Sequence, residues 1–303
     1  MPSSDSNVPR GLAYAIGAYG IWGLCLPLYM KALSHVSALE IVGHRVIWAI
    51  PCGILLLWWQ GILRNFGRHL RDPRTVALAS LTAALISINW GVYVYAIISG
   101  QALAAALGYY INPLVNVVLG AVFLAERPNR TQGIAIALAV VGVAIMTAKA
   151  GSLPWISLVL AGSFGTYGLL RKVVPVGATE GFTLEVLILA IPAFALLLLL
   201  PEGGPFQHTS WDMLLLIGAG PLTAAPLILY AAGARLLHYA TIGILQYIVP
   251  TLIFLTAVFL FGEPFGAWQL IGFAFIWSAL AVYSWSLFGS ARARRRTTAR
   301  PAQ

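Results

Sequence analysis

The sequence predicts an all-α integral membrane protein of ten transmembrane helices, arranged as two inverted five-helix repeats with both termini in the cytoplasm. Overall apolarity, the length of the apolar runs and the distribution of basic residues predict the ten spans and the side of the termini, and an internal repeat predicts the two inverted halves. Hydrophobic residues make up 60% of the chain and charged residues only 9%, whereas soluble domains carry about 25% charged residues. With a mean hydropathy of +0.86, the chain cannot cover itself with a polar surface.

The apolar runs are each close to the roughly 20 residues that a helix needs to cross the hydrocarbon core. Their unbroken apolarity favours helices over barrel strands, which would show alternating segments of about ten residues. The first run contains Tyr14, Trp22 and Pro27 and has no convincing small-residue cleavage site, so we interpret it as a retained span. In order, the expected helices cover residues 11–30, 38–60, 74–98, 102–125, 131–149, 154–172, 181–200, 211–233, 240–261 and 266–289.

Basic residues are concentrated at alternate ends of the expected helices. Most of the 18 Lys and Arg residues lie in the same set of connections as the arginine-rich tail, whereas the other set holds Lys31 and Lys149. The positive-inside rule then places both termini in the cytoplasm, which requires an even number of spans. This distribution accounts for the net charge of +9 without a nucleic-acid partner, and we interpret the tail as a topology and lipid-surface feature.

An internal repeat is visible in two pairs of segments. Residues 107–129, LGYYINPLVNVVLGAVFLAERPN, resemble residues 244–266, ILQYIVPTLIFLTAVFLFGEPFG, and GAYGIWGL at 17–24 resembles GSFGTYGL at 162–169. Chance similarity between glycine-rich apolar helices is the alternative explanation. Because five spans is an odd number, the two halves would have opposite orientations, as in many secondary transporters.

The repeat divides the chain into three parts. We expect a first repeat over residues 1–149, a second over 150–290, and a basic cytoplasmic tail over 291–303.

Two matched prolines, Pro113 and Pro250, are expected to weaken one helix in each repeat. A proline inside a helix removes a backbone donor and clashes with the preceding turn. Pro113 lies about 19 Å along its helix from Glu126, which would place it near the middle of the bilayer. Irregular backbone at that depth is tolerated where it is buried in protein or lines a wet cavity, so both prolines are candidate hinge or gating residues. A plain packing kink remains the alternative.

Polar and aromatic residues occur in the middle of several expected spans, although tyrosine and tryptophan usually prefer the membrane interfaces. Buried hydroxyl and amide groups need partners, and a shared wet cavity would satisfy many of them at once. The alternative is that they form hydrogen bonds between helices and bind no ligand. The candidate substrate-binding residues are Trp22, Asn89, Trp90, Tyr93, Tyr110, Asn112, Tyr167, Tyr230, Gln246 and Tyr247.

Charged residues inside the expected spans are few. Glu40 and His44 share one face of the second helix and are candidates for a proton-responsive gate, because histidine titrates near neutral pH. The alternative is an interfacial ion cluster in which Arg45 extends outward to the membrane surface. Glu185 matches Glu40 in the repeat and is a further gating candidate, while Glu126 and Glu263 lie at helix ends and are expected to cap or anchor loops.

The sequence contains no metal-ligand, nucleophile or phosphate-binding motif. Cys25 and Cys52 are isolated and are expected to be small apolar fillers. We therefore predict a protein that is not an enzyme and that needs no cofactor or metal.

Six segments together resemble a known family of membrane carriers. They are GIWG (20–23), HRVIW (44–48), NW (89–90), LGYYINPLVNVVLG (107–120), LQYIVPT (245–251) and FIW (275–277). In this order they resemble the RarD-like branch of EamA-domain transporters, in the drug/metabolite transporter superfamily. The resemblance covers roughly residues 10–290. It implies two inverted EamA repeats and an inner-membrane carrier, usually an exporter, of small metabolites, amino acids or drugs.

The sequence thus favours an exporter that binds small amphipathic molecules between its two repeats and works by alternating access. Its expected partners are a small-molecule substrate and membrane lipids. Two alternatives belong to other classes of protein: a receptor or scaffold that transports nothing, and a membrane enzyme acting on lipid, which would need paired carboxylates or a metal cluster.

Overall fold

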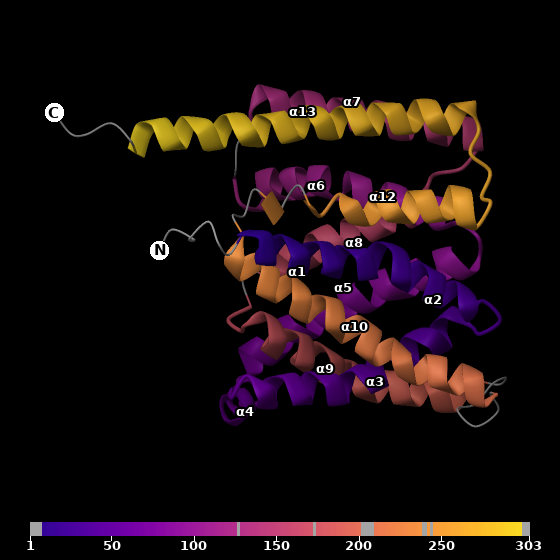
Figure 1. Ribbon diagram of the computed structural model, residues 1–303, viewed down its shortest axis with the longest axis vertical. Helices are drawn as coiled ribbons and strands as arrows, with labels where there is room; N and C mark the ends of the chain where they lie inside the picture. Colours follow the sequence, from indigo (N-terminus) through magenta and orange to yellow (C-terminus); the bar gives the residue numbers. More distant parts are fainter. Residues whose placement is uncertain are drawn as a thin grey trace.

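The computed structural model is a bundle of helices that run roughly side by side (Figure 1). It describes residues 8–298 except 126–127, 172–173, 201–208, 238–240 and 243–244, and the elements in these ranges are all helical. The elements are α1 (Val8–Gly20), the π-helical η2 (Ile21–Cys25), α2 (Leu26–Ala32), α3 (Ala38–Trp59), α4 (Leu63–Arg71), α5 (Pro73–Ile98), α6 (Ala102–Phe123), α7 (Arg130–Ala150), α8 (Trp155–Arg171), α9 (Ala178–Leu199), α10 (Ser210–Leu236), α12 (Ile248–Leu255), the π-helical η3 (Thr256–Leu260) and α13 (Ala267–Thr298).

Eight helices of the described chain are long and apolar enough to cross a membrane. They are the continuous segment Val8–Ala32 and helices within α3, α5, α6, α7, α9, α10 and α13. The expected span 154–172 corresponds to α8, which has 17 residues, and part of the expected span 240–261 corresponds to the shorter apolar helix Ile248–Leu260. The prediction of a multi-pass, all-helical membrane protein is therefore confirmed, while the count of ten crossings stays a prediction.

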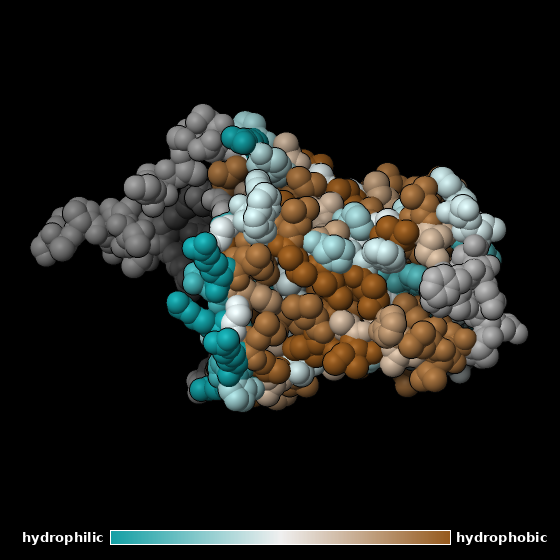
Figure 2. Space-filling model, turned by 90° about the horizontal axis from the view of Figure 1, so that it is seen from below, coloured by the Kyte–Doolittle hydropathy of each residue, from teal (hydrophilic) through white to brown (hydrophobic). Residues whose placement is uncertain are grey.

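Helix α4 was not expected from the sequence, since its 9 residues are too few for a span. Phe66 is buried against Leu57 and Ala79, while the arginines of α4 point away from the core. We call the end of the bundle that carries α4 the basic end. The start of α1 and the end of α13 lie at this same end (Figure 1). In Figure 2, hydrophilic residues gather at one end and hydrophobic residues cover the middle, as expected for a membrane-embedded bundle.

Helices distant in sequence pack against one another: α3 with α9 and α10, α6 with α8 and α12, α7 with α13, α1 with α10, and α5 with α8. Small residues allow the closest of these approaches. Gly142 of α7 lies against Gly272 of α13, and Gly220 of α10 lies against the backbone of Trp48 in α3. Glycine at a crossing lets two backbones come together, and lipid offers no hydrophobic effect that would drive helix association otherwise.

Irregular backbone occurs at places other than the matched prolines. Helix α6 continues through Pro113, and Pro250 lies in the first turn of α12, where a missing donor does little harm. The π-helical segment η2 instead precedes Pro27, whose nitrogen cannot donate to Gly23, and the amide of Leu26 donates to Ile21. Such π-turns often occur at functional sites, and this one carries Trp22.

Glu263 caps a helix, as expected. One oxygen of its carboxylate accepts from the amide of Ala102 at 2.6 Å, and the other accepts from the amide of Leu103 at 2.8 Å. These are amides of the first turn of α6, which have no partner inside their own helix. Glu263 thereby ties α6 to the connection between η3 and α13, whereas Glu126 lies outside the described residues.

Candidate functional site

The centre of the bundle contains a buried guanidinium group. Arg45 of α3 is 3% exposed, its Nε donates to the hydroxyl of Thr223 in α10 at 2.7 Å, and its guanidinium carbon lies 4.5 Å from the ring centroid of Trp90 in α5. Tyr93 and Tyr109 are close enough to interact with it electrostatically. We call Arg45, Trp90, Tyr93, Tyr109 and Thr223 the arginine cluster.

Asn89 links three helices beside the arginine cluster. Its side-chain amide donates to the carbonyl of Leu160 at 3.1 Å and to the hydroxyl of Ser163 at 3.0 Å, both in α8. Its oxygen accepts from the hydroxyl of Tyr109 in α6 at 3.2 Å. Because Asn89 is 1% exposed, these bonds replace the water it would otherwise hold, and they fix α5, α6 and α8 relative to one another.

A second buried charge lies toward the basic end of the bundle. Glu185 of α9 accepts from Thr82 of α5 at 2.7 Å and from Tyr167 of α8 at 3.1 Å, and one of its oxygens is 3.8 Å from Nη1 of Arg171. Arg171 also donates to the carbonyl of Gly177 at 3.3 Å. These side chains, which we call the glutamate cluster, join the end of α8 to the starts of α5 and α9.

A continuous row of aromatic rings connects the two clusters. Ring centroids are 6.0 Å apart for Tyr93 and Tyr109, 6.1 Å for Tyr109 and Phe164, and 6.0 Å for Phe164 and Tyr167. Such separations are typical of favourable aromatic pairs. The aromatic row therefore runs through the bundle from a buried cation at Arg45 to a buried carboxylate at Glu185.

The other expected substrate-binding residues fall into separate groups. Trp22 and Tyr230 pack together at 5.9 Å and both contact Tyr19. The hydroxyl of Tyr110 lies 2.9 Å from that of Thr251, and its ring packs on Phe273.

Three further candidates vary in their exposure. Asn112 is buried, Tyr247 is half-buried beside the hydrophobic core, and Gln246 is exposed. The structure thus brings Tyr93 and Tyr167 into the aromatic row, with Asn89 bonded to Tyr109 and Trp90 in the arginine cluster at one end of it, while the remaining candidates have other partners.

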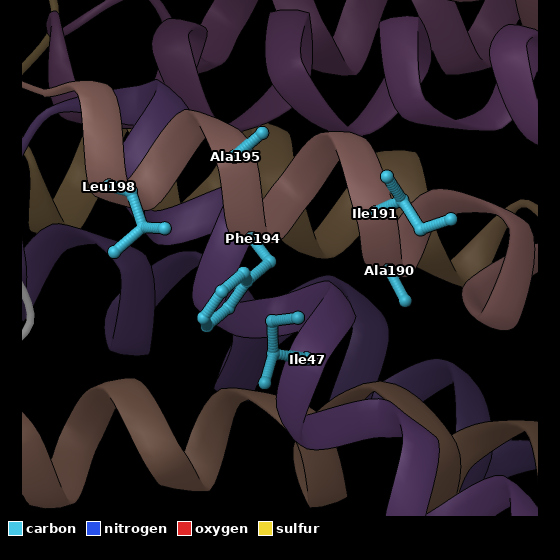
Figure 3. A pocket seen from close by; sticks show the side chains of 6 residues that line it. All are labelled: Ile47, Ala190, Ile191, Phe194, Ala195 and Leu198. Atoms are coloured by element: carbon cyan, nitrogen blue, oxygen red, sulfur yellow. The ribbon is translucent and has the colours of Figure 1, made fainter.

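Glu40 and His44 are both buried, and Nδ1 of His44 accepts from the indole of Trp48 at 3.3 Å. His44 lines an apolar pocket of about 380 Å³ formed by α3, α9 and the first turn of α10. A neighbouring pocket of about 430 Å³ is lined by Ile47 of α3 and by residues of α9 (Figure 3). The lining of these two pockets includes none of the expected substrate-binding residues, so the expected wet cavity is not at either of them.

The sequence interpretation in which Arg45 extends outward to the membrane surface is wrong, because its side chain is buried under Trp90 and Thr223. Arg45 lies seven residues inside α3, about 10 Å from the helix start, and this depth was the feature of the sequence that could have indicated burial. Thr82, Ser163 and Thr223 were also missed. A threonine or serine in an apolar helix commonly bonds its own backbone, so nothing in the sequence distinguishes those that reach another helix.

A multi-pass bundle of apolar helices that encloses a few charged, polar and aromatic side chains within a largely apolar core defines an α-helical membrane protein. Residues 9–148 match the EamA-like transporter family. An uncharacterized transporter of Pseudomonas aeruginosa is 44% identical over 95% of this chain and 98% of its own length. The protein RarD of Salmonella typhimurium is 42% identical over 90% of this chain and 94% of its own. This chain therefore belongs to the EamA-like transporter family, within its RarD-like branch.

Two further comparisons extend over most of the chain. A chloramphenicol-sensitive protein RarD of Pseudomonas aeruginosa is 36% identical over 91% of this chain and 93% of its own length. A solved crystal structure with 18% identity covers 90% of this chain and 96% of its own, with a TM-score of 0.60. At that identity the structural match supports the fold alone.

Proposed function

We propose that this protein is a secondary transporter of the inner membrane that exports small amphipathic metabolites, such as amino acids or drug-like compounds, by alternating access. Both termini would lie in the cytoplasm, at the basic end. Membership of the EamA-like transporter family and the names of the relatives support transport as the function. The site, the direction and the mechanism are inferred from the physical features below.

The observation that carries this proposal is the aromatic row with its two buried charges. Ionisable groups inside a membrane span are costly and in most cases mark a substrate or ion pathway. Here Arg45 and Glu185 lie in adjoining parts of the bundle interior, and tyrosine rings fill the space between them. Aromatic faces and hydroxyl groups suit a ligand that has both apolar and polar parts.

The helix pairing supports two inverted repeats, residues 1–149 and 150–290. If α1–α2, α3, α5, α6 and α7 correspond to α8, α9, α10, α12 and α13, three of the observed pairs join corresponding helices: α3 with α9, α6 with α12, and α7 with α13. The pairing of α1 with α10 then corresponds to that of α8 with α5. A two-fold axis in the membrane plane would generate this pattern, and rocking of one repeat against the other is the usual route to alternating access.

The glutamate cluster is the proposed gate at the basic end. Opening a path there requires α8 to separate from α5 and α9, which breaks the bond of Tyr167 to Glu185 and the ion pair of Arg171 with Glu185. At the opposite end, Glu40 corresponds to Glu185, and His44 is the proposed proton-coupling residue. Within the aromatic row Tyr93 is buried, Tyr109 and Tyr167 are half-buried and Phe164 is exposed, and we assign this arrangement to an occluded state between two openings.

Proteoliposome counterflow with radiolabelled amino acids and amphiphilic drugs tests this proposal. We expect saturable flux for at least one compound, reduced about tenfold or more by Trp90→Ala or Tyr110→Ala, since losing an aromatic contact weakens binding. Trp58→Ala is the matched control, because Trp58 is 66% exposed on the outside of α3. Absence of flux for every compound would contradict transport, and flux unaffected by both substitutions would contradict the site.

A further inference from the structure

The guanidinium of Arg45 has a surplus of hydrogen-bond donors. Its Nε donates to Thr223, but its Nη1, which is buried, has no hydrogen-bond partner within the described part of the chain. The hydroxyl of Tyr93, which belongs to the same cluster, is also buried without a described partner. Buried donors left without acceptors are uncommon in native proteins, and each calls for an explanation.

Arg45 also lacks a counter-charge. Ion pairs in the part of the chain that the structure describes include His35 with Asp212, His69 with Glu180, and Arg171 with Glu185, and none of these involves Arg45. The groups near Arg45 are instead neutral: a threonine hydroxyl, a tryptophan face and two tyrosines. A buried charge without a partner is strongly unfavourable, and inside a membrane no water replaces the missing anion.

The contacts of Arg45 hold it in place without neutralising it. Stacking on Trp90 and the bond to Thr223 fix the plane of the guanidinium between α3, α5 and α10. A fixed, planar guanidinium matches a carboxylate, which can accept two parallel hydrogen bonds from it. One isolated cation among neutral side chains balances a single negative charge, whereas a doubly charged phosphate would need further cations.

We propose that Arg45 binds the carboxylate of the transported molecule, with Trp90 and Tyr93 contacting the rest of it. This inference rests on the proposed transport function and adds to it the chemical class of the substrate, a monocarboxylate with an apolar or aromatic body. The bound anion would supply the missing acceptor and neutralise the buried charge. The occluded state would then be more stable with substrate than without it, which favours passage of the loaded carrier.

Matched pairs of compounds test the proposal directly on the purified full-length protein. Each pair consists of a carboxylate and its amide: 3-phenylpropionate with 3-phenylpropanamide, benzoate with benzamide, and L-leucine with L-leucinamide. We expect at least one carboxylate to raise the unfolding temperature of the wild type while its amide does not. The variants are Arg45→Gln, Arg45→Lys and, as a control on the surface helix α4, Arg64→Gln.

For that carboxylate, Arg45→Gln should weaken binding about tenfold or more, since a hydrogen bond to a charged group is lost. Arg45→Lys should give an intermediate loss, because lysine keeps the charge but not the planar fork. Arg64→Gln should bind as the wild type does. The unfolding temperature of each variant without ligand shows whether it remains folded. If Arg45→Gln does not fold, the binding test is made with Arg45→Lys alone.

Three outcomes would overturn the inference. They are a lack of stabilisation by every carboxylate, equal stabilisation by carboxylate and amide, and carboxylate selectivity that survives in both Arg45 variants. Counterflow separates this failure from failure of the transport proposal. If neutral compounds are transported but no carboxylate binds, the role of Arg45 is wrong and the proposed transport function is unaffected. If no compound is transported, the proposed transport function itself is contradicted.

Discussion

At the residue scale, a threonine can either join two helices or bond only within its own helix, as the buried Thr82 and the half-buried Thr147 show. Thr82 donates to the carboxylate of Glu185 on another helix, whereas Thr147 donates to the carbonyl of Val143 in its own helix. The first bond joins α5 to α9 through a buried charge, and the second adds nothing between helices. A hydrogen bond to a charged group is also stronger than one between neutral groups.

Replacing these two threonines by valine, which has nearly the same shape, should have unequal effects. Thr82→Val should lower the free energy of unfolding by about 1–3 kcal/mol, because the carboxylate of Glu185 loses a donor in a site that water does not reach. Thr147→Val should change it by less than about 0.5 kcal/mol, because only a local bond to its own helix is lost. Thermal unfolding in the same detergent measures both, and equal midpoints would contradict the role given to Thr82.

The residue scale is also where sequence reasoning was weakest. Polar and aromatic residues in mid-span are unusual, which makes Asn89, Trp90, Tyr93 and Tyr167 candidates, and the structure places all four in the aromatic row or in contact with its end at Arg45 and Tyr109. Their partners could not be chosen in the same way. Whether an arginine or threonine faces lipid, its own backbone or another helix depends on how the helices are rotated, and helix rotation is set by packing against neighbours.

At the scale of the element, glycine decides which helices can approach closely. Two glycines in long helices illustrate this. A methyl group on Gly220 of α10 would collide with the backbone of Trp48 and Ala49 in α3, whereas one on Gly91 of α5 would meet no atom within 4 Å. The backbone of a helix cannot move aside as a flexible side chain does, so the first position has no room for alanine.

We therefore expect opposite results from one substitution at these two sites. Gly220→Ala should destabilise the protein by about 1–3 kcal/mol or more, because α10 must move away from α3. Gly91→Ala should be neutral or stabilising by up to about 1 kcal/mol, because alanine is the better helix former. Unfolding temperatures in a common detergent test the pair, and tolerance of Gly220→Ala would mean that α3 and α10 cross at a greater distance than described.

The elements also show what pattern alone can predict about backbone irregularity. Proline was expected to mark weak points at Pro113 and Pro250, yet α6 continues through the first, and the second lies in a helical first turn. The π-helical segments occur at Ile21–Cys25 and Thr256–Leu260 instead. A helix can absorb a proline when neighbouring helices support it, so the position of a π-turn depends on packing as well as on sequence.

For the whole molecule, the two ends of the bundle carry different chemistry. The basic end holds α4 with Arg64, Arg68 and Arg71, while the opposite end holds Lys31 and Lys149, which lie over the rings of Phe261 and Trp268. By the positive-inside rule the basic end should face the cytoplasm, and α4 should lie at the surface of that leaflet.

Cysteine labelling tests this orientation. In a background carrying Cys25→Ala and Cys52→Ala, we expect a membrane-impermeant thiol reagent to modify Ser152→Cys in intact cells. Arg68→Cys, at the basic end, should react only after the membrane is opened. Both positions are exposed, so a difference in reaction reports the side of the membrane and not burial. Labelling of Arg68→Cys in intact cells would contradict a cytoplasmic basic end.

The sequence by itself determined that this protein is a multi-pass helical membrane protein and to which family it belongs. A segment that is apolar over the thickness of a bilayer is stable there as a helix, because a helix satisfies its backbone hydrogen bonds within its own segment and needs no water. Motif order along the chain was enough to indicate the family. Both conclusions depend on local properties of the chain, which the sequence contains directly.

Only the tertiary structure decided which polar side chains meet. Arg45 stacks on Trp90 and bonds to Thr223, and Glu185 accepts hydrogen bonds from Thr82 and Tyr167. These partners come from different helices. In an almost uniformly apolar helix the hydrophobic pattern does not fix which face turns inward, because lipid and protein interior are similarly apolar. Packing of small residues against neighbouring helices sets that rotation, and with it the buried charges from which the site is inferred.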